Sequence, residues 1–158
     1  MAAETKREKQ GVTIRALRKE DTAAVTKILQ EAPEAANWPE ESLVESLSWP
    51  GAVALIAETE GIVTGFIIGR QVADEAEILN VAVASSERRR GQGRELLNAA
   101  LEEFRSRGIR RVFLEVRESN VIAITFYTKQ GFAKTGRRGG YYREPEEAAV
   151  VMGRKLTG

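Results

Sequence analysis

The chain has 158 residues, a length suited to one domain with a core of ordinary size. Its 24 basic and 23 acidic residues leave a net charge of +1, which argues against a general nucleic-acid-binding surface. Cysteine and histidine are both absent, which excludes disulfides, thiolate nucleophiles, Cys/His zinc sites and Ser-His-Asp triads. Proton transfer must therefore use carboxylates, tyrosines, lysines, backbone amides or water, and we expect no metal.

The first ten residues are polar and charged and lack the apolar core of a secretory signal. No stretch approaches the roughly 18 consecutive apolar residues of a membrane helix. We therefore expect a flexible segment at residues 1–10, a single domain over residues 11–158, a cytoplasmic location and no membrane partner.

Hydrophobic periodicity predicts the order β-α-α-β-β-β-α-β-α-β-β, a mixed α/β (α+β) fold. In chain order we expect a strand at 12–17, a helix capped by Asp21 and ended by Pro33, and a short helix from Pro39. A hairpin of 52–58 and 62–71 that turns at Glu60-Gly61 follows, then a strand at 75–83 and a helix that ends near Gly108. The last elements are a strand at 112–116, a helix at 121–130 capped by Ser119 or Asn120 and ended by Gly131, and strands at 132–138 and 148–156.

The chain around residues 81–97 is typical of a strand, an anion-binding loop and a helix. Three arginines, Arg88, Arg89 and Arg90, precede Gly91-Gln92-Gly93, and an apolar helical pattern follows. A helix start offers unpaired N–H groups and positive potential, glycines let a ligand approach them, and arginines add forked donors. The spacing fits neither a Walker loop nor a dinucleotide fingerprint. We expect a pyrophosphate ligand here, and the alternative is a surface turn with a solvated basic run.

Two side chains are candidates for proton transfer. Glu115 lies in an apolar strand, and partial removal from water disfavours the charged form of a carboxylate, which makes it a better base. The alternative is that Phe113, Glu115 and Arg117 line a solvated face. Tyr127 lies near the end of the next helix, where its phenol can protonate a departing thiolate, or it packs its ring and exposes its hydroxyl as most tyrosines do.

The pattern Arg88-x-x-Gly91-x-Gly93 after a strand resembles the coenzyme A pyrophosphate loop of the GNAT acetyltransferase superfamily. Other runs resemble the ribosomal-protein-alanine N-acetyltransferase family, the RimI type, within that superfamily: Asp74-Glu75-Ala76-Glu77-Ile78-Leu79-Asn80-Val81-Ala82-Val83, Leu114-Glu115-Val116-Arg117-Glu118-Ser119-Asn120, Ala123-Ile124-Thr125-Phe126-Tyr127, Gly131-Phe132 and Tyr141-Tyr142. The resemblance runs from about residue 12 to residue 155. It implies the GNAT fold, with about seven strands in a mixed central sheet and about four flanking helices.

The same resemblance implies a role for each matching residue. Glu115 matches the general base and Tyr127 the general acid. The implied acetyl-CoA-binding residues are Val81, Ala82, Val83, Arg88, Arg89, Arg90, Gly91, Gln92, Gly93, Arg94 and Asn120, and the implied acceptor-binding residues are Trp38, Tyr141 and Tyr142. Glu75, or alternatively Glu77, is expected to bind the acceptor by favouring basic residues further along it. The chain departs from the family pattern at Arg88, where relatives often carry glutamine, and at Gln92, where small or apolar residues are common. Neither change removes a backbone donor.

The implied activity is acetyl transfer from acetyl-CoA to the α-amine of a protein N-terminus, starting with alanine as in a ribosomal protein. Without a cysteine for an acyl-enzyme, transfer would be direct within a ternary complex, by a monomer or weak dimer. Three other functions remain open: a lysine or small-amine acetyltransferase, a non-catalytic acyl-CoA-binding module, and a nucleic-acid-binding protein that clamps phosphates with Arg88–Arg90 and Arg137-Arg138 and stacks Tyr141 and Tyr142 on bases.

Overall fold

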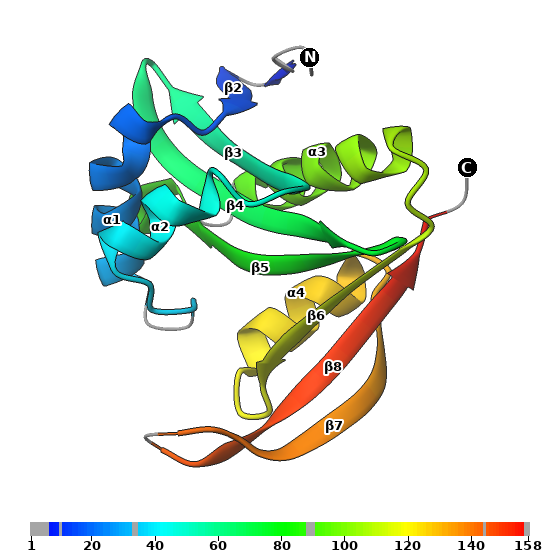
Figure 1. The fold of residues 1–158 in the computed structure, drawn as a ribbon. Helices are drawn as coiled ribbons and strands as arrows, with labels where there is room; N and C mark the ends of the chain where they lie inside the picture. Colours follow the sequence, from blue (N-terminus) through cyan, green and yellow to red (C-terminus); the bar gives the residue numbers. More distant parts are fainter. Residues whose placement is uncertain (1–6, 10, 33–34, 88–90, 144, 157–158) are drawn as a thin grey trace.

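A mixed eight-stranded sheet runs through the molecule, and helices cover both of its faces (Figure 1). The computed structural model describes residues 7–9, 11–32, 35–87, 91–143 and 145–156. The strands are β1 (Arg7–Lys9), β2 (Val12–Ala16), β3 (Ala52–Thr59), β4 (Ile62–Val72), β5 (Glu75–Val83), β6 (Arg111–Arg117), β7 (Ala133–Tyr142) and β8 (Glu147–Lys155), in the sheet order β1-β2-β3-β4-β5-β6-β8-β7. The helices are α1 (Thr22–Gln30), α2 (Glu40–Ser46), α3 (Gln92–Ser106) and α4 (Val121–Lys129), with 3₁₀ turns η1 (Lys19–Asp21) and η2 (Ser85–Glu87).

The predicted mixed architecture and the order of its elements are confirmed. The strand beyond the predicted seven is β1, three residues that pair with β2 inside the segment we expected to be flexible. The hairpin of β3 and β4 turns at Glu60 and Gly61 as predicted. Strand β7 continues through Tyr142, where we expected a polar connection, because Tyr142 pairs with Glu147 of β8 after a register shift.

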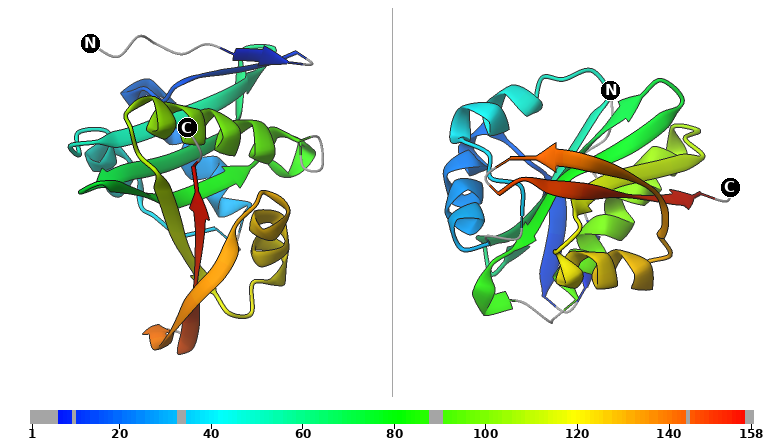
Figure 2. Two further views of the ribbon diagram at one scale, coloured as in Figure 1. Left: turned by 90° about the vertical axis from the view of Figure 1, so that its right-hand side faces the viewer. Right: turned by 90° about the horizontal axis from the view of Figure 1, so that it is seen from below.

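The sheet separates two apolar cores. Helices α3 and α4 cover one face, where Phe104 and Leu114 are buried, and α1 and α2 cover the other, where Phe66 and Leu43 are buried (Figure 2). Among the described residues, none of the helices combines the length and hydropathy that crossing a bilayer requires.

Strands β5 and β6 are the only parallel neighbours registered in the described sheet, and they separate after one short contact. They pair at Ala76–Val112 and Glu77–Phe113, and from there the two strands diverge (Figure 1). Just past this contact β5 carries a bulge, since Ile68 of β4 pairs with Asn80 and Gly69 pairs with Ile78. Leu79 is the extra residue, and the bulge increases the local twist of the strand. The result is an opening in the middle of the sheet.

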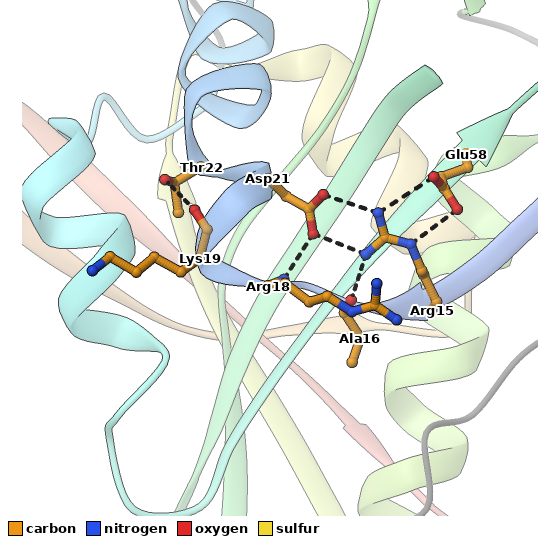
Figure 3. A network of polar contacts seen from close by, with 7 residues as sticks. All are labelled: Arg15, Ala16, Arg18, Lys19, Asp21, Thr22 and Glu58. Carbon is orange, nitrogen blue, oxygen red and sulfur yellow. Dashed lines mark hydrogen bonds and ion pairs between the residues drawn. The ribbon is translucent and has the colours of Figure 1, made fainter. Parts of the chain in front are cut away.

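Asp21 occupies the N-cap position of α1, as predicted, but its side chain does not cap the helix. No side-chain hydrogen bond caps α1, and the carboxylate instead accepts bonds from the Arg15 guanidinium at 2.8 and 2.9 Å and from the Arg18 N–H at 2.8 Å (Figure 3). Arg15 also donates to Glu58 at 2.9 Å, so it ties β2 to β3 and η1. Burial alone would raise the pKa of Asp21, but the bonds from Arg15 and Arg18 outweigh it and the net pKa is lowered. Pro33, the predicted end of the first helix, lies outside the described residues.

Candidate active site

The start of α3 lies beside the opening between β5 and β6. Gly91 precedes the helix with φ +80°, a left-handed conformation that glycine adopts without steric cost. The next glycine, Gly93, lies against α4, because a Cβ added there would be 3.5 Å from Phe126 Cζ and 3.8 Å from Val83 Cγ2. The first amides of α3 are thus presented next to β5 and α4, as an anion site requires. Arg94 is exposed, and the predicted Arg88, Arg89 and Arg90 lie outside the described residues.

Gln92 turns its side chain into the protein. It is 2% exposed, its Oε1 accepts a 2.8 Å hydrogen bond from Thr64, and its Nε2 donates to Thr59 at 3.2 Å and to Glu87 at 3.1 Å. Gln92, which departs from the family pattern, therefore links the loop to the β3–β4 hairpin through hydrogen bonds to Thr59 and Thr64. Only the backbone of Gln92 remains available for the ligand contact that we predicted.

Glu115 lies on β6 where the opening begins. Its neighbour Leu114 is buried in the core under α3 and α4, so the carboxylate faces the α1 and α2 side. The Glu115 side chain is 12% exposed, and its Oε2 is buried without a hydrogen-bond partner. Arg138 of β7 approaches that oxygen at 3.8 Å, an ion-pair distance that is longer than a hydrogen bond. The alternative of a solvated surface carboxylate does not fit this burial.

A second carboxylate shares this face. Glu77 of β5 is largely buried and lies 3.8 Å from Arg70 of β4. Burial raises the pKa of Glu77, Arg70 lowers it, and the negative charge of Glu115 raises it, with a net upward shift. Because the charge of Glu115 raises the pKa of Glu77, the two carboxylates lie near each other on this face.

Tyr127 of α4 is on the opposite face. It is 5% exposed and packs edge-on against Phe126 and Phe132. Burial raises the pKa of its phenol, so Tyr127 keeps its proton throughout the neutral range. That is the protonation state a general acid needs, while its position also stabilises the core.

The remaining predicted residues fall on both sides of the opening. Val81 and Val83 pack against the core under α3 and α4, whereas Ala82 is buried on the α1 and α2 side. The Asn120 side chain caps α4 by accepting from the Ala123 N–H at 3.1 Å, as predicted for the helix. Its contact with a cofactor stays a prediction.

The predicted acceptor-binding aromatic residues are held by neighbouring rings and arginines. Trp38 lies edge-on to Trp49 with ring centroids 5.9 Å apart, beside α1 and α2. Tyr141 and Tyr142 contact each other at 5.1 Å, and the Arg117 guanidinium lies 4.5 Å above the Tyr142 ring. Burial, together with the nearby charge of Glu115, raises the pKa of Tyr142 to about 12. Glu75 begins β5, on the same face as Glu77.

Two features of the site were missed from the sequence. The side chain of Asn80 is 4% exposed and faces the α1–α2 connection, and Arg138 reaches Glu115 from two strands away. The signal for Asn80 was present, because the alternation from Glu75 to Val83 breaks at the adjacent apolar pair Ile78-Leu79. Arg138 had no local signal, since its contact depends on the pairing of β6, β8 and β7.

A mixed sheet that opens between two parallel strands, next to a glycine-bearing helix start, has the architecture of the GNAT acetyltransferases. Residues 22–132 match the model of the family described as the acetyltransferase (GNAT) family. The chain belongs to this family.

Relatives with named activities match over different shares of their length. The ribosomal protein bS18-alanine N-acetyltransferase of Escherichia coli (strain K12) is 38% identical over 94 residues, which are 58% of this chain and 64% of the relative. That match therefore spans less than two thirds of the relative. The putative ribosomal protein bS18-alanine N-acetyltransferase of Bacillus subtilis (strain 168) is 33% identical over 140 residues, 88% of this chain and 92% of the relative.

Solved structures share the fold. The ribosomal-protein-S18-alanine N-acetyltransferase from Escherichia coli superimposes with a TM-score of 0.81 and 31% identity, covering 93% of this chain and 96% of that one. A putative streptothricin acetyltransferase from Bacillus anthracis, solved in complex with acetyl coenzyme A, has a TM-score of 0.67 and 25% identity over 72% of this chain and 68% of that one.

Proposed function

We propose that this protein transfers the acetyl group of acetyl-CoA to the α-amine of a protein that begins with alanine, such as a ribosomal protein. The observation that carries this proposal is the buried Glu115 Oε2 at the opening between β5 and β6, which lies 3.8 Å from Arg138 but has no hydrogen-bond partner. A buried acceptor of this kind is matched to a donor-rich cationic group, and an ammonium has three N–H donors and no acceptor.

The opening fits acetyl-CoA. The start of α3, with Gly91 in its left-handed conformation, offers backbone N–H groups and positive potential to the pyrophosphate. Beyond Glu77, β5 no longer pairs with β6, and we expect an extended pantetheine arm to lie along residues 80–83 there. Acetyl-CoA supplies an activated thioester. Its complex with a protein of the same fold supports this assignment.

The two proposed proton-transfer residues lie on opposite faces of the sheet, on either side of the opening. Glu115 takes a proton from the acceptor ammonium, directly or through water, and leaves the nitrogen lone pair free to attack the thioester carbonyl carbon. A backbone N–H of residues 80–83 stabilises the negative charge that develops on the carbonyl oxygen. As the carbon–sulfur bond breaks, Tyr127 donates its proton to the sulfur, and solvent restores that proton. Transfer is direct, because the chain has no cysteine to carry the acetyl group.

An α-amine is the acceptor that one glutamate serves best. Its pKa is near 8, whereas that of a lysine side chain is about 10.4, so it loses its proton more readily. The names of two relatives support alanine as the first residue. Trp38 and the Tyr141-Tyr142 pair flank this side of the sheet and are proposed to limit the size of the first side chain.

The test is a competition for acetyl transfer between an alanine-starting peptide, the same peptide with a blocked N-terminus and an internal lysine, and a polyamine. We expect the free N-terminus to be acetylated fastest, and Glu115→Gln to lower kcat by about 10²- to 10⁴-fold with unchanged acetyl-CoA affinity. The matched control is Glu118→Gln, which changes an exposed glutamate three residues away and should turn over like the parent. Faster acetylation of the blocked peptide or the polyamine would contradict the substrate, and parental turnover of Glu115→Gln would contradict its role.

A further inference from the structure

Three buried side-chain atoms of the described residues lack a hydrogen-bond partner: Arg70 Nε, Asn80 Oδ1 and Glu115 Oε2. An unpaired buried polar group costs about 1–3 kcal/mol, so such atoms mark places where another group completes the bonding. Asn80 Oδ1 and Glu115 Oε2 are both acceptors, and their strands border the opening on its two sides. Arg70 Nε is a donor on β4, beside Glu77.

By residue count along the two strands, the bulge in β5 aligns Asn80 with Glu115. Counting from the last pair, Glu77–Phe113, Ile78 of β5 is level with Leu114 of β6. Relative to β4, the next step on β5 contains two residues, Leu79 and Asn80, so counting one further residue along β6 aligns Asn80 with Glu115. Without the bulge, alternation would turn Asn80 toward the core under α3 and α4.

The hydrogen bonding of Asn80 fixes the face and the direction of its amide. Its Nδ2 donates a 2.9 Å bond to the carbonyl of Ala36 in the α1–α2 connection, so the side chain is on the face to which Glu115 also points. The reverse orientation of the amide would set two oxygens against each other, so the donor must face Ala36. Oδ1 is therefore the end of the amide that does not bond Ala36, and it is buried without a hydrogen-bond partner, since Asn80 as a whole is only 4% exposed.

We propose that Asn80 Oδ1 and Glu115 Oε2 bind the acceptor amine together, one from each border of the opening, and that Asn80 is a substrate-binding residue. This inference rests on the proposed function. Glu115 takes one proton of the ammonium, and Asn80 keeps hold of a remaining N–H while the lone pair is released for attack. Because the same amide holds Ala36, acceptor binding and the position of residues 35–38 are linked.

The experiment measures what the amine contributes to binding, with and without Asn80. Two peptides are titrated by calorimetry into the full-length protein saturated with coenzyme A: one beginning with alanine, and one in which a propionyl group replaces that alanine. The propionyl group keeps the carbon skeleton of alanine and lacks only the amine. The ratio of the two dissociation constants is the contribution of the amine, and its change in a variant is a double-mutant cycle.

We expect Asn80→Ala to reduce this ratio by about tenfold, the loss of one hydrogen bond to a charged group. Asn80→Asp keeps an acceptor oxygen but loses the donor to Ala36, and it should hold the ratio at the parental value or raise it. An unchanged ratio in Asn80→Ala would overturn the inference, because a purely structural asparagine weakens both peptides equally. An equal reduction of the ratio in Asn80→Asp would also overturn the inference, because the lost hydrogen bond to Ala36 would then explain the weaker binding of the amine.

The proposed function is tested separately in the same samples. If the parent acetylates the alanine peptide but the ratio of dissociation constants is unchanged in Asn80→Ala, the proposed role of Asn80 is wrong and the proposed acetyltransferase activity is supported. No acetylation by the parent would overturn both. Acetyl-CoA affinity and the urea midpoint of each variant are measured as well, because they separate a local loss of binding from a change in fold.

Discussion

Replacing Gln92 by leucine tests how the phosphate loop is anchored. The change removes the three hydrogen bonds that the buried amide makes with Thr64, Thr59 and Glu87. Thr64 loses its shortest hydrogen bond and keeps two longer contacts, with the Thr59 hydroxyl at 3.2 Å and the Ala57 carbonyl at 3.4 Å, while Thr59 and Glu87 are partly exposed and regain bonds to water. Exchanging the 2.8 Å bond for these longer contacts costs about 1 kcal/mol, which lowers the melting temperature of a chain of this length by roughly 2–4 °C.

Urea unfolding of the parent, Gln92→Leu, Thr64→Val and the double variant tests whether the hydrogen bonds of Gln92 stabilise the protein. We expect Gln92→Leu to lower the midpoint without changing the m-value. The double variant should recover at least half of that loss, because removing both partners leaves no unpaired group. A Gln92→Leu protein as stable as the parent, or strictly additive losses in the double variant, would refute the anchoring role of Gln92.

Three further predictions concern the cofactor site, the general acid and acid stability. Gly91→Ala and Gly108→Ala each place alanine at a φ near +80°, which costs about 1 kcal/mol of stability. Only Gly91→Ala should weaken acetyl-CoA binding, by about tenfold in calorimetry. Equal affinities of the two variants would contradict the phosphate site. Tyr127→Phe keeps the packed ring and should slow turnover less than Glu115→Gln does, because water can also protonate the thiolate; a parental rate would remove Tyr127 from the mechanism. Since the folded pKa of Asp21 is lowered, its ionisation stabilises the protein above the unfolded pKa of about 3.9, and this contribution is lost as the pH falls through the folded value. The urea midpoint of Asp21→Asn should therefore fall less between pH 7 and pH 3 than that of the parent, and parallel curves would argue against this contribution.

The sequence predicted those parts of the fold that depend on local pattern. Periodicity located the strand at residues 75–83 and the helix after Gly93, and Asn120 and Gly131 marked the two ends of α4. These signals are short-range, because a cap or a face of a helix is encoded within a few residues. The candidate acid, Tyr127, lies on α4, and the candidate base, Glu115, lies on β6, a strand that its apolar run also predicted.

Contacts between residues far apart in the chain could not be predicted from the sequence. The carboxylate of Asp21 is a good helix cap in isolation, but it bonds Arg15 once β2 brings that guanidinium near. Gln92 reads as a ligand-facing loop residue, and only the position of Thr64 on β4 shows that it points inward. In both cases a buried partner from another element outcompetes the local role, since leaving such a partner unpaired is costly.

The parting of β5 and β6 has a consequence for cooperativity. Among the residues that the structure describes, the β1–β5 part of the sheet and the β6–β8–β7 part share two registered pairs of backbone residues, so the two halves can loosen from each other before either unfolds. A ligand seated in the opening touches both halves and makes them unfold as one unit. Hydrogen exchange should therefore show β6, β7 and β8 protected less than β3 and β4 in the free protein, with the difference closing when acetyl-CoA is added.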